Sequence, residues 1–145
     1  MDWLFDLLLI LHFLGLAMGL SVGLSNMVMM SLITNAAGPD KAVLARFPPA
    51  MSRVGDIGLS LLWISGLGML FNRYGGFEGL SALGWTLHVK LTAVVILTGL
   101  VGYMHTLMRK ARNGDTAAAA QLPTIGRVAF LMAVTAIVFA VVTFG

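Results

Sequence analysis

Residues 7–26 of the chain read LLLILHFLGLAMGLSVGLSN, an apolar run with a histidine, His12, near its beginning. A transmembrane helix needs about 20 consecutive apolar residues, so this stretch is long enough to cross a bilayer. Residues 85–105, WTLHVKLTAVVILTGLVGYMH, form a second such run, which carries His88 and Lys90 in its first turns. Because an ionisable side chain costs free energy in hydrocarbon, these three residues are candidates for function. Neutral imidazole binds haem iron and copper well, which points to a haem or metal site.

The composition is that of a membrane protein. Of the 145 residues, 59% are hydrophobic and 10% are charged, whereas soluble domains carry about 25% charged residues. The chain therefore predicts one all-α integral membrane domain over residues 1–145. Cysteine is absent, which excludes disulfides, thiolate metal sites and iron–sulfur clusters. The net charge of +3 could suggest a nucleic-acid partner. However, the basic residues stand beside the apolar segments, so we expect membrane lipid and no nucleic acid as partner.

Breaks in the apolar pattern predict a four-transmembrane-helix bundle. Residues 38–40 (Gly-Pro-Asp) and 47–49 (Phe-Pro-Pro) mark a first connector, because proline disrupts a helix interior. Residues 74–84 contain several glycines and form a second connector. Residues 109–123 are polar, with an alanine run that favours a short surface helix. The four spans are expected at about residues 3–33, 53–71, 85–108 and 124–144.

The placement of charge predicts the orientation of the spans. Lysine and arginine concentrate in and beside the first and third connectors, whereas the second connector has only Arg73, which is offset by Glu78. Basic loops stay on the cytoplasmic side of a membrane. Both termini are therefore expected outside, in a multi-pass protein of the bacterial inner membrane. The basic residues on the expected inner side are Lys41, Arg46, Arg53, Arg109, Lys110, Arg112 and Arg127.

Small residues recur along the first predicted span. Gly15, Gly19 and Gly23 repeat every four residues, and His12 and Asn26 extend the same helical stripe. Small residues carry helix association in lipid, so we expect this stripe to face the protein interior. One interpretation is a tight helix contact with a hydrogen-bonded histidine above it. The other is a slot for a flat cofactor, with His12 as its ligand.

The third predicted span carries a similar stripe. At the helical period, His88, Thr92, Val95, Gly99 and Gly102 lie within about 40° of one another. We therefore expect His88, like His12, to face the interior of the bundle.

The two histidines also have compatible depths. Measured from the middle of each span, they differ by about three residues, or roughly 4.5 Å, which helix tilt can absorb. His12 and His88 could therefore bind opposite faces of one haem. Lys90 points almost opposite to His88 and is expected to extend its stem to the outer interface. His105 lies near the inner face, where we expect an interfacial histidine or a neighbour of a propionate or phosphate.

Arg53 and Asp56 form a polar group at the inner end of the second span. Their i, i+3 spacing predicts an ion pair on one helix, which Arg127 could join. The alternative interpretation is a path for protons or substrate at the inner face.

Methionine raises the question of copper, because thioether sulfur suits Cu(I). Of the ten methionines, Met27, Met29 and Met30 are clustered in sequence rather than spaced along one helical face. Methionine also fills apolar gaps, so the pattern favours haem over copper.

Residues 84–91, GWTLHVKL, resemble the third helix of the HemJ-type protoporphyrinogen oxidases, small bundle-forming membrane proteins that bind b-type haem. In that family a tryptophan precedes a Leu-His-x-Lys-Leu element, and a first-helix histidine is followed by a glycine, as in His12 and Gly15. Arg53 is similar to an arginine of that family. Residues 24–30 depart from the pattern, because they lack its arginine and aromatic residues. The outline also resembles the membrane domain of CopD-type copper-resistance proteins.

The resemblance implies a haem b protein in which His12 and either His88 or Lys90 are the iron ligands. The helical projection favours His88. Gly15 and Gly19 would then admit the porphyrin.

Three functions are compatible with these features. The first is a b-type haem protein in redox or electron transfer, with HemJ-like protoporphyrinogen oxidation as its enzymatic form. In it, Arg53, Arg127 or Arg73 could pair with carboxylates of haem or substrate. The second is a cofactor-free accessory subunit of a homo-oligomer or a larger membrane complex. The third is CopD-like copper handling.

The charge bias generates a topology prediction. Reporter fusions after Thr34, Gly76 and Asp115 should report inside, outside and inside, because basic connectors are retained in the cytoplasm. The reverse pattern would contradict this orientation and would place His12 in the inner half of the membrane.

Overall fold

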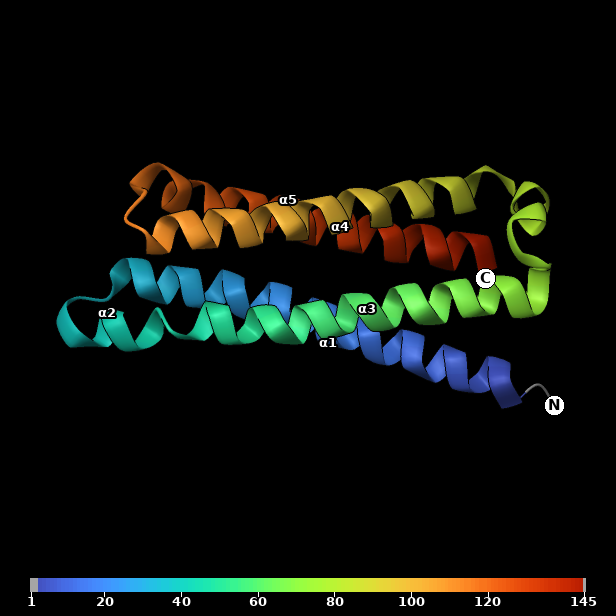
Figure 1. Cartoon of the computed structure of the whole chain (residues 1–145), viewed down its shortest axis with the longest axis horizontal. Coiled ribbons are helices and arrows are strands. Elements are labelled where there is room, and N and C mark those ends of the chain that lie inside the picture. The colour runs from blue at the N-terminus through green and yellow to red at the C-terminus, as the bar shows by residue number, and fades with distance from the viewer. Residues whose placement is uncertain (1–2, 145) are drawn as a thin grey trace.

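The computed structural model describes residues 3–144, apart from the side chains of residues 80, 82, 83, 143 and 144. The domain predicted over residues 1–145 extends beyond this range only at residues 1, 2 and 145. Figure 1 shows long helices lying side by side, with both ends of the described chain at the same end of the bundle. In chain order the elements are α1 (Trp3–Asn35), α2 (Gly38–Leu44), α3 (Phe47–Tyr74), the 3-10 helix η1 (Gly76–Leu83), α4 (Gly84–Arg112) and α5 (Thr116–Phe144).

The structure confirms the all-α, four-helix prediction. Within residues 3–144, four helical stretches are long and apolar enough to cross a membrane, and no strand occurs. Large apolar side chains cover the outside of the bundle, among them Ile10 at 63% and Val141 at 65% exposure. Such exposure is expected where the surroundings are hydrocarbon. The protein is therefore a multi-pass membrane protein.

The proline-rich segments lie inside helices, contrary to expectation. Residues 47–49 begin α3, with proline in its first turn. The first N–H groups of a helix lack intrahelical partners, so proline is tolerated there. Residues 38–40 likewise begin α2 instead of ending a helix.

The third connector is shorter than the sequence predicts. Residues 109–123 are divided between the end of α4 and the start of α5, which continues through Pro123. The chain turns over residues 113–115, where Gly114 adopts a φ of 93°. Asp115 Oδ1 accepts a hydrogen bond from the Ala118 backbone N–H at 3.0 Å. This arrangement is an N-cap, which satisfies a donor at the beginning of α5.

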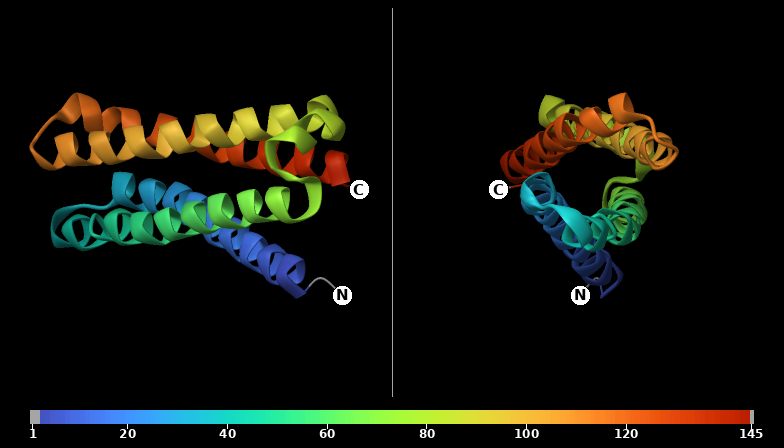
Figure 2. Two further views of the ribbon diagram at one scale, coloured as in Figure 1. Left: turned by 45° about the vertical axis from the view of Figure 1, so that its right-hand side comes forward. Right: turned by 90° about the vertical axis from the view of Figure 1, so that its left-hand side faces the viewer.

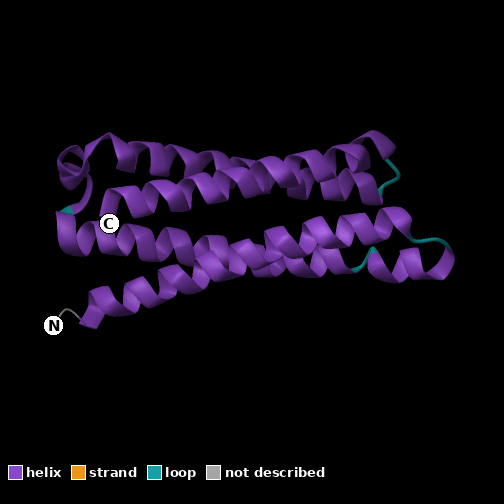
Figure 3. Ribbon diagram, turned by 180° about the vertical axis from the view of Figure 1, so that it is seen from behind, coloured by secondary structure: helices purple, strands orange, loops and turns teal. Residues whose placement is uncertain are grey.

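The helices form two close pairs. In one pair α1 packs along α3, and in the other α4 packs along α5, while a smaller contact joins α1 to α5. The end-on view in Figure 2 shows the two pairs as separate layers. Figure 3 shows the connections crowded at the two ends of the bundle, so the long faces consist of helix alone.

The first pair depends on a glycine crossing. An ideal Cβ on Gly15 would lie 2.7 Å from the carbonyl oxygen of Gly58, which is too close for any side chain. The predicted helix contact at Gly15 is therefore confirmed. Gly23 instead faces α5, since its Cβ would lie 2.8 Å from Cδ2 of Phe130. A Cβ on Gly19 would meet nothing within 4 Å, so this part of the stripe has open space beside it.

Helix α3 supplies further glycines that face α1. A Cβ on Gly66 would lie 3.5 Å from Cε1 of His12, and one on Gly68 would lie 2.8 Å from Cδ2 of Leu8. The signal for this contact in the sequence is the close spacing of small residues within SGLG (residues 65–68).

The prediction that the α4 stripe with His88 faces the interior of the bundle is wrong. His88 and Thr92 are exposed, Val95 is 57% exposed, and Gly99 and Gly102 have open space beside them. This stripe therefore faces away from the other helices. The buried residues of α4 are Leu87, Ala93 and Leu107. Leucine and alanine can pack against protein as well as against lipid, so small or polar residues alone do not identify the inner face.

The crossing predicts different effects for two glycines of α1. Gly15→Ala should lower the free energy of unfolding by about 1–3 kcal/mol, because its Cβ would overlap the Gly58 carbonyl oxygen. Gly19→Ala should be neutral or stabilising, since alanine favours a helix by about 0.5–1 kcal/mol over glycine. Unfolding in detergent micelles measures both. Equal destabilisation would contradict the assignment of the crossing to Gly15.

Candidate functional site

His12 lies where α1 meets α3, and its ring is held by a buried hydroxyl. Nδ1 of His12 is 2.9 Å from Oγ of Ser65, which is 0% exposed. The hydroxyl of Ser65 donates its proton to the carbonyl oxygen of Leu61. Ser65 must therefore accept a hydrogen bond from the Nδ1–H of His12. The lone pair of the neutral imidazole then lies on Nε2, the atom left to bind a ligand.

Lys90 of α4 lies on the His12 side of the bundle. It is half-buried and close enough to His12 for its charge to act on the imidazole. His88 is exposed, and its Nδ1 donates to the carbonyl oxygen of Gly84 on its own helix at 3.0 Å. The structure therefore reverses the facing expected for His88 and Lys90. It brings together His12 of α1 and Ser65 of α3, and it places Lys90 of α4, rather than His88, on their side of the bundle.

Other polar groups join or line the helices elsewhere in the bundle. Nε1 of Trp63 donates to Oγ1 of Thr98 at 3.0 Å, which links α3 to α4. Asn26, the last residue of the α1 stripe, has a buried Oδ1 without a hydrogen-bond partner among the described residues.

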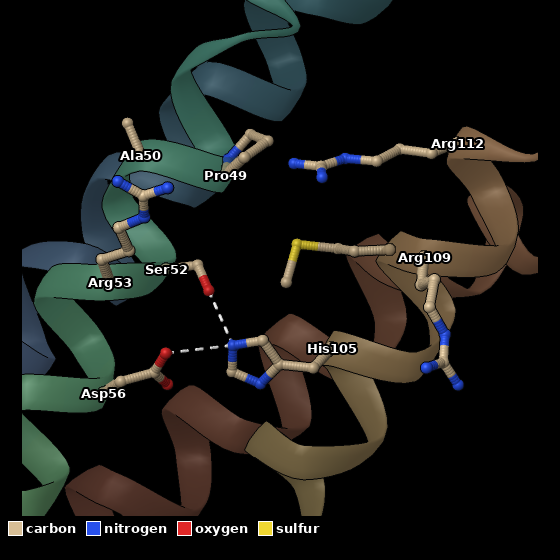
Figure 4. Close-up of a pocket in the computed structure, with 9 residues that line it drawn as sticks. Pro49, Ala50, Ser52, Arg53, Asp56, His105, Arg109 and Arg112 are labelled. Carbon is tan, nitrogen blue, oxygen red and sulfur yellow. Dashed lines mark hydrogen bonds and ion pairs between the residues drawn. The ribbon is translucent and has the colours of Figure 1, made fainter.

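A pocket of about 510 Å³ lies between the beginning of α3 and the end of α4. His105 reaches across it, with Nε2 2.8 Å from Oγ of Ser52 and 3.2 Å from Oδ2 of Asp56 (Figure 4). Nδ1 of His105 donates to the carbonyl oxygen of Val101 at 2.9 Å, which fixes the ring. Nε2 thus meets both a hydroxyl and a carboxylate from the neighbouring helix pair. Three arginines, Arg53, Arg109 and Arg112, also line the pocket.

The expected ion pair between Arg53 and Asp56 is wrong. Asp56 pairs with His105 of α4, and Figure 4 shows the Arg53 side chain extending away from Asp56. The i, i+3 spacing permits a contact on one helix, but the tertiary contact with His105 occupies the carboxylate instead. The predicted position of His105 at this end of its helix agrees with the structure.

Over residues 3–144, side chains that could bind a metal ion without a cofactor do not cluster. Within the part of the chain that the structure describes, no group of three or more His, Asp or Glu side chains could hold an ion. A haem needs only one or two protein ligands, because the porphyrin provides the others.

No protein-family model matches the chain, and no curated protein or solved structure matches it either. The resemblance to the HemJ-type oxidases therefore remains a hypothesis that rests on residues 84–91, His12, Gly15 and Arg53.

The hydrogen bond between His12 and Ser65 generates a stability prediction. Ser65→Ala should lower the free energy of unfolding by about 1–3 kcal/mol, because the Nδ1–H of His12 would lose its buried acceptor. Ser60→Ala is the matched control, since its exposed hydroxyl bonds only the Asp56 carbonyl oxygen of its own helix. That change should stay within about 0.5 kcal/mol. Denaturation in the same detergent would measure both variants, and equal losses would show that the bond to His12 contributes nothing.

Proposed function

We propose that this protein resides in the bacterial inner membrane, binds b-type haem between its two helix pairs, and acts in redox or electron transfer. The observation that carries the proposal is the setting of His12. Metal-ligating histidines almost always donate their second ring N–H to an acceptor, which fixes the tautomer and the orientation. Ser65 accepts that hydrogen bond here, so Nε2 of His12 would be available to hold the haem iron.

Lys90 is the second proposed ligand. Its amine comes from the opposite helix pair and its charge acts on the His12 imidazole, which supports a site between α1 and α4. The sequence favoured His88 for this role, but its exposure argues against it, because α4 would have to rotate to turn His88 inward. The open space beside Gly19 is compatible with a flat group next to α1.

Bound haem would supply one-electron redox chemistry, while the chain would hold and orient it. Ser65 would keep the His12 ring in one tautomer. HemJ-like oxidation of a porphyrinogen is the enzymatic form of the proposal, and it depends on the resemblance of residues 84–91. The competing function is a cofactor-free accessory subunit of a membrane complex.

The proposal predicts a spectrum and its response to substitution. Protein purified from haem-replete cells should give a reduced b-type haem spectrum. His12→Ala should abolish haem binding, and Lys90→Ala should abolish it or convert low-spin haem to a high-spin form. His88→Ala is the matched control on the same helix and should leave the spectrum unchanged, because His88 lies on the exposed face.

Two outcomes would contradict this assignment. Wild-type protein without haem would favour the accessory-subunit function. Loss of the low-spin spectrum in His88→Ala but not in Lys90→Ala would make His88 the ligand and would require a different rotation of α4.

A further inference from the structure

We infer that the pocket between the beginning of α3 and the end of α4 binds a phosphate group at the membrane surface. This site is separate from the His12 site. Asp56 in the pocket and Ser65 beside His12 lie nine residues apart on α3, or about 13.5 Å along the helix. The inference therefore stands whether or not the protein binds haem.

The charge of the pocket favours an anion. Three arginines line it, Arg53, Arg109 and Arg112, against the single carboxylate of Asp56. That carboxylate lies 3.2 Å from Nε2 of His105, with which it forms an ion pair when the imidazole is protonated. Among the described residues, the structure gives no ion pair to any of the three arginines. The pocket thus holds an excess of positive charge that its own acidic residue does not neutralise.

The chemistry of the arginines suits an oxyanion. Arg53 comes from α3, whereas Arg109 and Arg112 come from α4. Figure 4 shows the Arg53 guanidinium beside Ala50 and the Arg109 guanidinium turned away from Arg112. Figure 4 shows Arg112 extending across the pocket towards Pro49 on the opposite wall. A guanidinium presents a planar fork of donors, which matches phosphate oxygens in a bidentate manner. The hydroxyl of Ser52 adds a neutral polar group on the α3 wall.

The position of the pocket favours phosphate as the oxyanion. Helix α4 has 29 residues, which gives a length of about 44 Å, whereas the hydrocarbon core is about 30 Å thick. Its final turns therefore reach the headgroup layer, where phospholipids carry their phosphates. Met108 and Pro49 give the same pocket an apolar part, against which a lipid glycerol or acyl group could lie. Basic pockets between transmembrane helices commonly bind anionic headgroups.

The phosphate could belong to an anionic lipid or to a soluble phosphate, and the experiment separates these sources. Wild-type protein is placed in phosphatidylcholine nanodiscs with and without phosphatidylglycerol. The protein is then released from the nanodiscs, and the lipid that stays bound to it is measured by native mass spectrometry. Preferential retention of phosphatidylglycerol indicates a lipid source. In phosphatidylcholine alone, inorganic phosphate is compared with chloride at equal ionic strength. A rise of the unfolding temperature with phosphate indicates a soluble source.

Charge-matched variants assign the effect to the pocket. Arg53→Gln combined with Arg112→Gln should weaken phosphate-dependent binding about tenfold or more, because two charge-assisted contacts are lost. Both side chains are exposed, so circular dichroism should show an unchanged helix content. The control combines Lys41→Gln with Arg127→Gln, which removes the same charge from exposed residues outside the pocket. Its binding should change less than about twofold.

Two results would overturn the inference. One is a wild-type protein that retains both lipids equally and gains no thermal stability from phosphate, a result that depends on no variant. The other is an equal loss of binding in the pocket variant and in the control, which would indicate attraction to the basic surface in general.

Discussion

The approach of the α1 and α3 backbones at Gly15 and Gly58 is the constraint on which the rest of the first helix pair depends. Lipid tails are as apolar as leucine, so burial from lipid does not drive helices together. At this crossing the absence of Cβ atoms lets the two backbones approach closely enough to pack. With the two backbones fixed there, the turn that precedes Gly15 places His12 against Ser65. The orientation of the imidazole is thus a consequence of a contact between glycines.

The number of membrane-crossing helices and the contact at Gly15 could be predicted from the sequence. The thickness of the hydrocarbon core sets the length of an apolar run, and this signal needs no knowledge of neighbouring helices. The facing of α4 could not be predicted in this way. The helical period establishes which residues share one side of a helix, as for His88, Val95 and Gly102. It does not establish whether that side faces protein or lipid. In a soluble helix, water would mark the outer side, but in a bilayer both sides are apolar.

Both candidate sites also contain contacts between residues distant in sequence. Asp56 has a possible partner, Arg53, one turn away, yet it pairs with His105 because α4 ends beside the start of α3. Lys90 is grouped with His12 for the same kind of reason, since the side-by-side arrangement of the two helix pairs brings α4 to the His12 side. Helical periodicity contains no information about which helices are neighbours, so neither group could be assigned from spacing alone.

The division into two helix pairs has a consequence for synthesis and insertion. The pair of α1 and α3 consists of residues that precede all residues of α4 and α5 in the chain. Each pair is therefore a local hairpin, and its close contacts can form while the ribosome is still extending the chain. The first hairpin can reach its glycine contact in the bilayer before the second hairpin is translated. The contacts between the two helix pairs, such as Trp63 with Thr98 and Asp56 with His105, can form only after the second hairpin has been translated.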